Sequence, residues 1–330
     1  MTHEDADVLV TGAGGFIGSH LVARLADRGD RVRALVHYNS RDDRGNLRFL
    51  TEEQQRRVTV IAGNVEDPGC VDAAVAGCRL VFHLAALIGI PYSYVAPRSY
   101  VATNVIGTQN VLDAVRRYGV ERMVHTSTSE VYGTARYVPI DEAHPLQGQS
   151  PYSATKIGAD KLAESYHLSF NLPVVTVRPF NTFGPRQSAR AVIPSIITQL
   201  LSGREVLQLG SLAPRRDFTY VGDTVAGFIA ASAADAAVGE TINLGNGKDI
   251  SIGELAERLC ALVRPGTRVE STDDRVRPAH SEVMTLLCAN DRARELLGWS
   301  PTVSLDEGLA RTVEFMRTHP EMYPTIDYTV

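Results

Sequence analysis

A glycine-rich turn between a short apolar strand and a helix is the feature that most constrains the fold of this chain. Val8–Thr11 has the pattern of a buried strand, and it leads directly into Gly12-Ala13-Gly14-Gly15-Phe16-Ile17-Gly18, where a helical pattern begins. Glycines at 12, 15 and 18 permit a tight turn, close approach of the backbone to a phosphate, and close packing of helix on strand. A helix N-terminus also offers unpaired N–H groups to an anion. At the first strand–helix junction of the chain, this turn predicts a dinucleotide site.

Strand and helix patterns alternate over about the first 180 residues. The expected strands are Val8–Thr11, 31–36, 58–62, 80–85, Arg122–Thr126 and 174–177. The expected helices between them are 17–28, 70–76, 99–118 and 152–170. Such β-α alternation predicts an α/β fold with a doubly wound parallel sheet, the Rossmann type.

The alternation stops after Pro179. Residues 180–190 are expected to form a loop, residues 216–221 and Thr241–Leu244 short strands, and residues 192–202, 252–263, 291–297 and 305–317 helices. This pattern predicts a smaller mixed α/β domain. We expect the dinucleotide-binding domain to comprise 1–178 plus about 217–250, and the second domain, which would bind the substrate, 179–216 plus 251–330.

Charge and composition exclude several classes of function. A net charge of -5 argues against nonspecific binding to nucleic acid. No apolar run reaches the ~20 residues that span a bilayer, and the acidic start has no features of a secretory signal. The four cysteines form no C-x-x-C pair, so we expect reduced thiols, no metal site and a cytoplasmic protein.

The end of the second strand bears on the choice between NAD and NADP. An acid there would bind the ribose hydroxyls, and a basic residue would accommodate a 2'-phosphate. The sequence reads His37-Tyr38-Asn39-Ser40-Arg41, without an acid at the strand tip. Ser40 and Arg41 are candidates for holding a phosphate, but they could equally lie in a solvated loop, so both cofactors stay open.

Tyr152 and Lys156 are the candidate redox pair. Their spacing of four residues on an expected helix places both side chains on one face. A lysine ammonium near a phenol favours the phenolate and lowers its pKa. Such a tyrosine can take the proton from a hydroxyl while a hydride leaves the same carbon.

Together these motifs resemble the extended short-chain dehydrogenase/reductase family. The matching segments are TGAGGFIG (11–18), HLAA (83–86), NVIGT (104–108), YSATK (152–156) and RDFTYVGD (216–223), in the expected order along nearly the whole chain. The resemblance implies a tightly bound NAD or NADP that each turnover regenerates. It implies cofactor contacts from Gly12, Gly15, Phe16, Ile17, Gly18, Ser40, Arg41, Asn64, Val65, Leu84, Ala85, Ala86, Asn104, Tyr152 and Lys156.

The subtype depends on Thr128-Ser129-Glu130 after the fifth strand. Sugar-nucleotide 4,6-dehydratases usually have Thr-Asp-Glu here, where the threonine positions the 4-hydroxyl, the aspartate protonates the leaving 6-hydroxyl and the glutamate removes the C5 proton. Thr128 and Glu130 match, but Ser129 replaces the acid, and an alcohol is a poor general acid. Either Glu130 shuttles the proton to the leaving water, or Ser129 relays it from elsewhere.

Thr-Ser-Glu also resembles the site of UDP-glucuronic acid decarboxylases, in which no leaving hydroxyl needs an acid. The wider sequence favours a dehydratase. Segments 85–97, 126–142, 144–160 and 178–194 resemble the 4,6-dehydratases of N-acetylglucosamine nucleotides in the legionaminic acid pathway. We therefore expect a UDP- or GDP-N-acetylglucosamine 4,6-dehydratase, with a nucleotide-uronic acid decarboxylase as the rival, a 4-epimerase third, and a 5,6-elimination not excluded.

Arginines of the second half are candidates for gripping the sugar nucleotide. Guanidinium groups suit a diphosphate because they are planar, permanently charged and bidentate. The resemblance implies contacts from Asn181, Arg216 and Arg277. Arg186 and Arg190 are further candidates, although they could be ordinary surface residues.

Two further hypotheses concern partners and catalysis. The helices at 99–118 and 152–170 carry apolar residues on more than one face, which predicts a homodimer built on a four-helix interface, as the resemblance also implies. A non-catalytic Rossmann redox sensor is the alternative of another class. The presence of Thr128, Glu130, Tyr152 and Lys156 together argues against it.

Overall fold

A seven-stranded parallel sheet forms the centre of the molecule. The computed structural model describes residues 7–272 and 283–324. The strand order is β11-β6-β5-β4-β1-β2-β3, and all neighbouring strands pair in parallel. The strands are β1 (Val8–Thr11), β2 (Val32–His37), β3 (Val58–Gly63), β4 (Leu80–His83), β5 (Arg122–Thr126), β6 (Val174–Pro179) and β11 (Thr241–Leu244). This order confirms the doubly wound Rossmann sheet, and it reverses between β1 and β4, where such sheets bind ligands.

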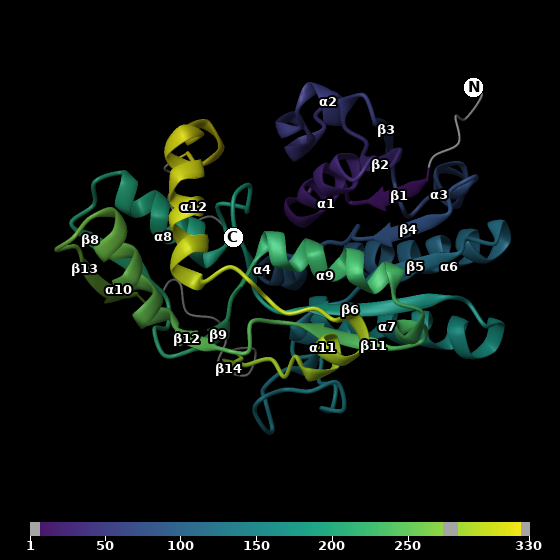
Figure 1. Ribbon diagram of the computed structural model, residues 1–330. Helices are drawn as coiled ribbons and strands as arrows, with labels where there is room; N and C mark the ends of the chain where they lie inside the picture. Colours follow the sequence, from purple (N-terminus) through teal and green to yellow (C-terminus); the bar gives the residue numbers. More distant parts are fainter. Residues whose placement is uncertain (1–6, 273–282, 325–330) are drawn as a thin grey trace.

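Helices cover both faces of this sheet (Figure 1). α1 (Phe16–Asp27), α9 (Val221–Ala233) and α11 (Asp291–Leu297) bury apolar side chains on one face. α3 (Pro68–Val75), α6 (Gly107–Tyr118) and α7 (Pro151–Phe170) do so on the other. Because both faces are covered, most residues of the strands are buried and apolar, as is usual for parallel strands.

The helix α7 that carries the candidate redox pair has strong sequence signals at both ends. Ser150 and Ser153 form a reciprocal capping box, and Pro151 occupies the first turn, where its missing N–H is not needed. The helix ends at Asn171, which adopts a left-handed conformation with φ of 54°. These boundaries agree closely with the expected helix.

A second group of elements lies at one end of the molecule, away from the large sheet (Figure 1). α8 (Val192–Leu201), α10 (Ile252–Val263) and α12 (Leu305–Thr318) share a core with the parallel pair β8 (Val206–Leu209) and β13 (Arg268–Ser271). A three-stranded sheet of β12 (Asp249–Ser251), β9 (Arg215–Asp217) and β14 (Thr285–Leu286) lies beside this group. The short parallel pair β7 (Thr182–Phe183) and β10 (Thr219–Tyr220) completes it.

Several elements differ from the sequence prediction. The expected strand at 216–221 is two short strands, β9 and β10, followed directly by α9, a helix that the sequence did not indicate. Its sequence VGDTVAGFIAASA has no clear polar face, because the helix is packed between the sheet and its neighbours, and periodicity fails for such helices. The expected loop at 180–190 contains β7, because β10 supplies its only partner strand from 37 residues downstream.

The expected helix 99–118 begins earlier and is not uniform. It consists of α5 (Pro97–Tyr100), a π-helical stretch Val101–Ile106 and α6. π-helical turns often occur at functional positions. The short helix α4 (Ile90–Val95) precedes it, where the sequence predicted no element. Within the described ranges, no helix is both long and apolar enough to cross a membrane.

Candidate active site

The glycine turn has the geometry that a dinucleotide site requires. Gly12 has a φ of 67°, and a Cβ there would lie 2.8 Å from the backbone nitrogen of Ala85. A Cβ at Gly18 would lie 2.3 Å from the carbonyl oxygen of Gly12, so α1 packs against the turn only because position 18 lacks a side chain. Gly15 begins α1 without a side-chain cap, so no side chain occupies its first N–H groups. Phe16 and Ile17, the first residues of α1, contribute to this end.

The loop after β2 folds back over the glycine turn. Asn46 donates its backbone N–H to the carbonyl oxygen of Gly14, at 2.9 Å. The side chain of Asn39 accepts hydrogen bonds from the backbone of Arg41 and Asp43 and thereby closes the loop. Ser40 and Arg41 are exposed, so both NAD and NADP remain compatible with this strand tip.

The segment after β4 lies beside the glycine turn. The hydroxyl of Thr11 accepts the backbone N–H groups of Leu84 and Ala85, both at 3.1 Å, which fixes the segment that Ala86 continues. Asn64 and Val65 follow β3 directly, and Val65 is buried.

Asn104 lies in the π-helical stretch and has no exposed surface. Its side chain accepts the N–H of Leu87 at 2.8 Å and donates to the carbonyl of Leu87 and to the hydroxyl of Thr155, both at 3.0 Å. Asn104 therefore joins the segment after β4 to helix α7. A contribution of Asn104 to the cofactor site would come through this segment.

Tyr152 and Lys156 lie on one face of α7, and both are nearly fully buried. The ammonium of Lys156 donates to the carbonyl oxygen of Thr126 at the end of β5, at 2.6 Å. Burial lowers the pKa of Lys156 to about 8, and the nearby charge of Asp160 opposes this shift. Burial also raises the pKa of Tyr152, although a hydrogen bond from Thr128 acts in the opposite direction. The lowered tyrosine pKa that the spacing predicted is therefore not found here, because desolvation of the phenol prevails.

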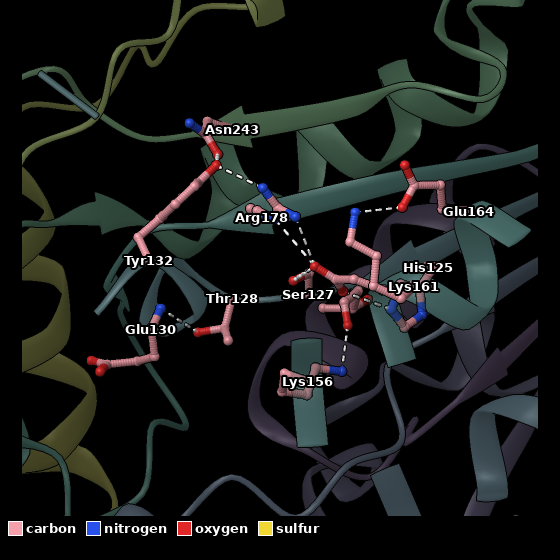
Figure 2. Close-up of polar contacts among 12 residues, drawn as sticks. His125, Ser127, Thr128, Glu130, Tyr132, Lys156, Lys161, Glu164, Arg178 and Asn243 are labelled. Atoms are coloured by element: carbon pink, nitrogen blue, oxygen red, sulfur yellow. Dashed lines mark hydrogen bonds and ion pairs between the residues drawn. The ribbon is translucent and has the colours of Figure 1, made fainter. Parts of the chain in front are cut away.

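The segment Thr128-Ser129-Glu130 follows β5 and lies next to the redox pair. Thr128 caps the short helical turn Ser129–Tyr132, its hydroxyl accepting the N–H of Glu130 at 3.3 Å. Ser129 is buried, whereas Glu130 is only half-buried. In Figure 2 the carboxylate of Glu130 points away from Lys156 and from the buried groups behind it. Glu130 is therefore the more accessible of the two polar side chains.

Behind Lys156 the structure places a buried polar cluster that the sequence analysis did not identify. Asp160, one helical turn after Lys156, is held by the side chains of His125 (β5), Ser127 and Arg178 (β6) (Figure 2). The only sequence signal is a run of polar residues at positions that should belong to an apolar core. Position 160 lies one turn beyond the lysine on the same helical face, which could have indicated it.

The candidate substrate-binding residues differ in burial and in hydrogen-bond partners. The side-chain oxygen of Asn181 is buried and has no hydrogen-bond partner among residues 7–272 and 283–324, so it is available to a ligand. Arg216 is buried in β9, and its guanidinium donates to the carbonyl oxygen of Arg215. Arg190 is exposed. Arg277 lies outside the described residues.

Arg186 points to the dinucleotide half of the molecule. Its φ is 69°, its guanidinium lies 5.2 Å from the ring of Phe49, and its backbone carbonyl accepts the side chain of Asn46. One guanidinium nitrogen is 3.5 Å from the hydroxyl of Ser19 in α1. This placement beside α1 favours a role near the cofactor turn over the substrate contact that we expected.

A Rossmann sheet, a glycine turn at its switch point, and a Tyr–Lys pair next to Thr-Ser-Glu define an extended short-chain dehydrogenase/reductase. The sequence pattern of the family described as GDP-mannose 4,6 dehydratase matches residues 9–312. The chain belongs to this family.

Several of the similar proteins are nucleotide-sugar dehydratases, and others are 4-epimerases. A dTDP-glucose 4,6-dehydratase of Actinoplanes sp. is 36% identical over 319 residues, which cover 94% of this chain and 98% of the relative. The crystal structure of DesIV, a dTDP-glucose 4,6-dehydratase from Streptomyces venezuelae with NAD bound, has a TM-score of 0.87 and 31% identity, covering 96% of this chain and 98% of DesIV. TunA, an NAD-dependent NDP-hexosamine 5,6-dehydratase involved in tunicamycin biosynthesis, has a TM-score of 0.83 and 28% identity, covering 95% of this chain and 98% of TunA.

Proposed function

We propose that this chain is an NAD(P)-dependent 4,6-dehydratase of a nucleotide-linked N-acetylglucosamine, with UDP or GDP as the nucleotide. The observation that carries the proposal is the placement of Thr128 and Glu130 at the end of β5, directly beside Tyr152 and Lys156. The family and the NAD-bound relative support the cofactor and the reaction type. The hexosamine rests on the resemblance of segments 85–97 and 178–194.

The residues divide the chemistry between two half-reactions. When bound, the nicotinamide accepts a hydride from C4 and returns it to C6. Tyr152 takes the proton from the 4-hydroxyl, which Thr128 orients, and Lys156 supplies positive charge beside the developing phenolate. Glu130 removes the C5 proton as the C6–O bond breaks, and the leaving oxygen departs as water with one proton. Glu130, reprotonated from solvent, then gives a new proton to C5 as C6 receives the hydride, and the proton held by Tyr152 is released to solvent.

Glu130 is the proposed shuttle for the leaving-group proton. It is half-buried, whereas Ser129 is buried and has the high pKa of an alcohol. A carboxylate next to C5 can therefore take the C5 proton and deliver it to the oxygen on C6.

The cofactor and nucleotide contacts remain proposals at the level of single residues. The uncapped end of α1 and the close approaches at Gly12 and Gly18 fit a pyrophosphate. The unpartnered oxygen of Asn181 fits a polar group of the substrate. The domain division at 1–178 plus about 217–250 likewise stays a prediction.

The decisive experiment incubates the protein with UDP- and GDP-N-acetylglucosamine and with UDP-glucuronate, followed by mass spectrometry. A dehydratase removes water from an N-acetylglucosamine nucleotide, and in D2O it places deuterium at C5 of the product. Glu130→Gln should stop the reaction after C4 oxidation. Reduced cofactor should then accumulate, which is measured by the near-ultraviolet absorbance of the reduced nicotinamide. Ser129→Ala should retain most of the activity if Glu130 is the shuttle.

A decarboxylase is the second candidate, because Ser129 stands where dehydratases usually have an acid. It would consume UDP-glucuronate with release of CO2 and leave both N-acetylglucosamine nucleotides unchanged. That outcome would overturn the dehydratase proposal while leaving the roles of Tyr152 and Lys156 intact. Binding of nucleotide without any turnover would instead indicate the non-catalytic alternative.

We also propose a homodimer that packs α6 and α7 of one subunit against those of a second. Apolar side chains are exposed on and around these helices, at Val101, Ile106, Tyr118, Leu168 and Phe170, with 43–75% of each accessible. Light scattering at micromolar concentration should give twice the mass of one chain, and a monomer would contradict the proposal.

A further inference from the structure

The buried carboxylate behind Lys156 has no part in the reaction described so far. Asp160 is 4% exposed, and it lies one turn after Lys156 on the same helix, on the side away from Tyr152. Burying an ionised carboxylate is costly unless charged or hydrogen-bonded partners compensate. Its partners therefore indicate what it does.

Three side chains hold Asp160 from two neighbouring strands and their ends. Ser127 donates its hydroxyl to one carboxylate oxygen at 2.7 Å, and Arg178 donates to that same oxygen through two nitrogens, at 3.0 and 3.2 Å. The other oxygen accepts from His125 at 3.2 Å. Although burial would raise it, the hydrogen bond from His125 and the charge of Arg178 lower the pKa of Asp160 to about 2. Asp160 is thus a permanent negative charge at neutral pH.

The two histidines near this charge are neutral. Burial lowers the pKa of His125, and burial together with the charges of His125 and Lys156 lowers that of His83. Their rings stack with centroids 5.9 Å apart, and His83 is satisfied by the hydroxyls of Thr11 and Thr108. Neither histidine therefore offsets the charge of Asp160 by protonation.

Besides Arg178 and the histidines, the titratable groups near the redox pair are Glu130, Tyr100 and Tyr132, whereas the cation Arg116 packs on Phe170 at the C-terminal end of α7. Besides burial, the charges of Glu130 and of Asp160 itself raise the pKa of Tyr152, and Tyr100 packs its ring against Tyr152 at 6.3 Å. Tyr132 donates to Asn243 and accepts from Arg178. Among the groups that the structure describes, the carboxylate of Asp160 is the one whose charge appreciably supports the Lys156 ammonium.

We propose that Asp160 is a positioning residue of the redox centre, a buried and permanently ionised carboxylate that keeps the adjacent Lys156 in its ammonium form. This carboxylate is held by hydrogen bonds from Arg178, Ser127 and His125. Lys156 is held in turn by its hydrogen bond to the carbonyl oxygen of Thr126. Without the carboxylate, a buried ammonium with one carbonyl partner would release its proton near neutral pH. Tyr152 would then lose the positive charge that stabilises its phenolate, a consequence that rests on the proposed function.

The lysine content of the chain permits a direct test. Lys156, Lys161 and Lys248 are the only lysines in the sequence, so protein labelled with 13C at the lysine ε-carbon gives three signals. In the wild-type protein the Lys156 signal, identified by its loss in Lys156→Arg, should titrate well below the ordinary lysine pKa of about 10.4. In Asp160→Asn its midpoint should fall by about one to two pH units, as expected for the loss of a close opposite charge.

Glu164→Gln is the matched control. Glu164 lies one turn further along α7 and pairs with exposed Lys161 at 2.6 Å (Figure 2). This variant removes one carboxylate from the same helix but should leave the Lys156 midpoint unchanged. If Asp160→Asn does not fold, Asp160→Asn/Arg178→Gln removes the stranded guanidinium as well, and a smaller downward shift is expected because a nearby cation is lost together with the carboxylate. An unchanged Lys156 midpoint in a folded variant without the carboxylate would overturn the inference.

A kinetic readout separates this role from a structural one. The rate of single-turnover reduction of the cofactor by a sugar nucleotide should fall as the pH rises and Lys156 loses its proton. The midpoint of this fall should lie at a lower pH in Asp160→Asn than in the wild-type protein. A uniformly slower reaction with the same pH dependence would contradict the inference. If the wild-type protein reduces no cofactor with any sugar nucleotide, the proposed function fails, while the lysine titration still decides the role of Asp160.

Discussion

Two buried aspartates in different regions of the molecule have pKa values that are shifted in opposite directions. Asp160 lies beneath the large sheet, where hydrogen bonds and the Arg178 guanidinium lower its pKa to about 2 against the effect of burial. Asp217 lies in β9 of the three-stranded sheet, has no exposed surface, and accepts three backbone N–H groups at 2.7–3.2 Å. Burial nevertheless raises the pKa of Asp217 to about 6.

The difference shows what kind of partner keeps a buried carboxylate charged. The N–H groups that Asp217 accepts come from Asn246, Gly247 and Cys288, and each is a neutral dipole. A guanidinium carries a full opposite charge, which the low-dielectric interior screens weakly. Asp160 therefore provides a negative charge beside Lys156 of the candidate redox pair. Asp217 instead joins three chain segments through hydrogen bonds.

The largest expected effect is the loss of turnover in Tyr152→Phe, which tests whether catalysis takes place at the redox pair next to Asp160. Tyr152→Phe should reduce turnover by about 10³-fold, since it removes the group that accepts the hydroxyl proton. Steady-state kinetics and NADH fluorescence should show lost activity with nearly unchanged cofactor binding. Tyr166→Phe is the control, because Tyr166 lies on the same helix and donates to Asp113 at 2.6 Å. Retention of most of the activity in Tyr152→Phe would remove the basis of the redox assignment.

The next effect compares the two aspartates in stability. At pH 7, Asp160→Asn should lower the free energy of unfolding by about 3–5 kcal/mol, because it leaves the buried Arg178 without its opposite charge. Asp217→Asn should cost less, about 1–3 kcal/mol, because its amide nitrogen cannot accept a hydrogen bond and leaves at least one buried backbone N–H without a partner, but no opposite charge is stranded. Urea denaturation of both variants measures this, and equal losses would refute the distinction.

The pH dependence of stability sharpens the same comparison. The folded-state pKa of Asp217, about 6, is raised above its unfolded value, so its contribution is present below about pH 4 and is lost as the pH rises through 6. A shift of two units corresponds to about 3 kcal/mol. The stability of the wild-type protein relative to Asp217→Asn should therefore decline by roughly this amount between pH 4 and pH 8. A constant difference across this range would contradict the raised pKa.

The smallest effect concerns the exposed ion pair on α7. Both members of the Lys161–Glu164 pair are at least half exposed, so solvent screens their attraction. Glu164→Gln should change the free energy of unfolding by about 0.5 kcal/mol or less. A loss of several kcal/mol would mean that burial does not distinguish this pair from Asp160 and Arg178.

Local sequence signals predicted the first half of the fold well. The expected strands and helices up to β6 are found, with shifts of a few residues at their ends, because amphipathic spacing, glycine turns and caps act within a few neighbours. α9 was missed because neighbouring elements cover most of its surface, so its sequence does not alternate between an apolar and a polar face. The two-residue strand β7 was missed because it depends on β10, a partner strand far along the chain.

The candidate site shows the same division. The glycine turn, the Tyr152–Lys156 pair and the Thr-Ser-Glu segment could be found in the sequence because each is a contiguous or helically spaced motif. Arg186 was expected to contact substrate, yet it lies against α1, since the conformation of the loop after β7 decides its direction. No local pattern encodes that direction.

The sequence by itself determined the sheet type, the position of the glycine turn and the helical spacing of the candidate redox pair. Only the tertiary structure decided that Asp160 is a charged partner of Lys156 and that Asp217 is not ionised in the same way. Both are aspartates in unremarkable local sequence. Their ionisation depends on burial and on charges that come from other strands, and these distances exist only in the folded chain.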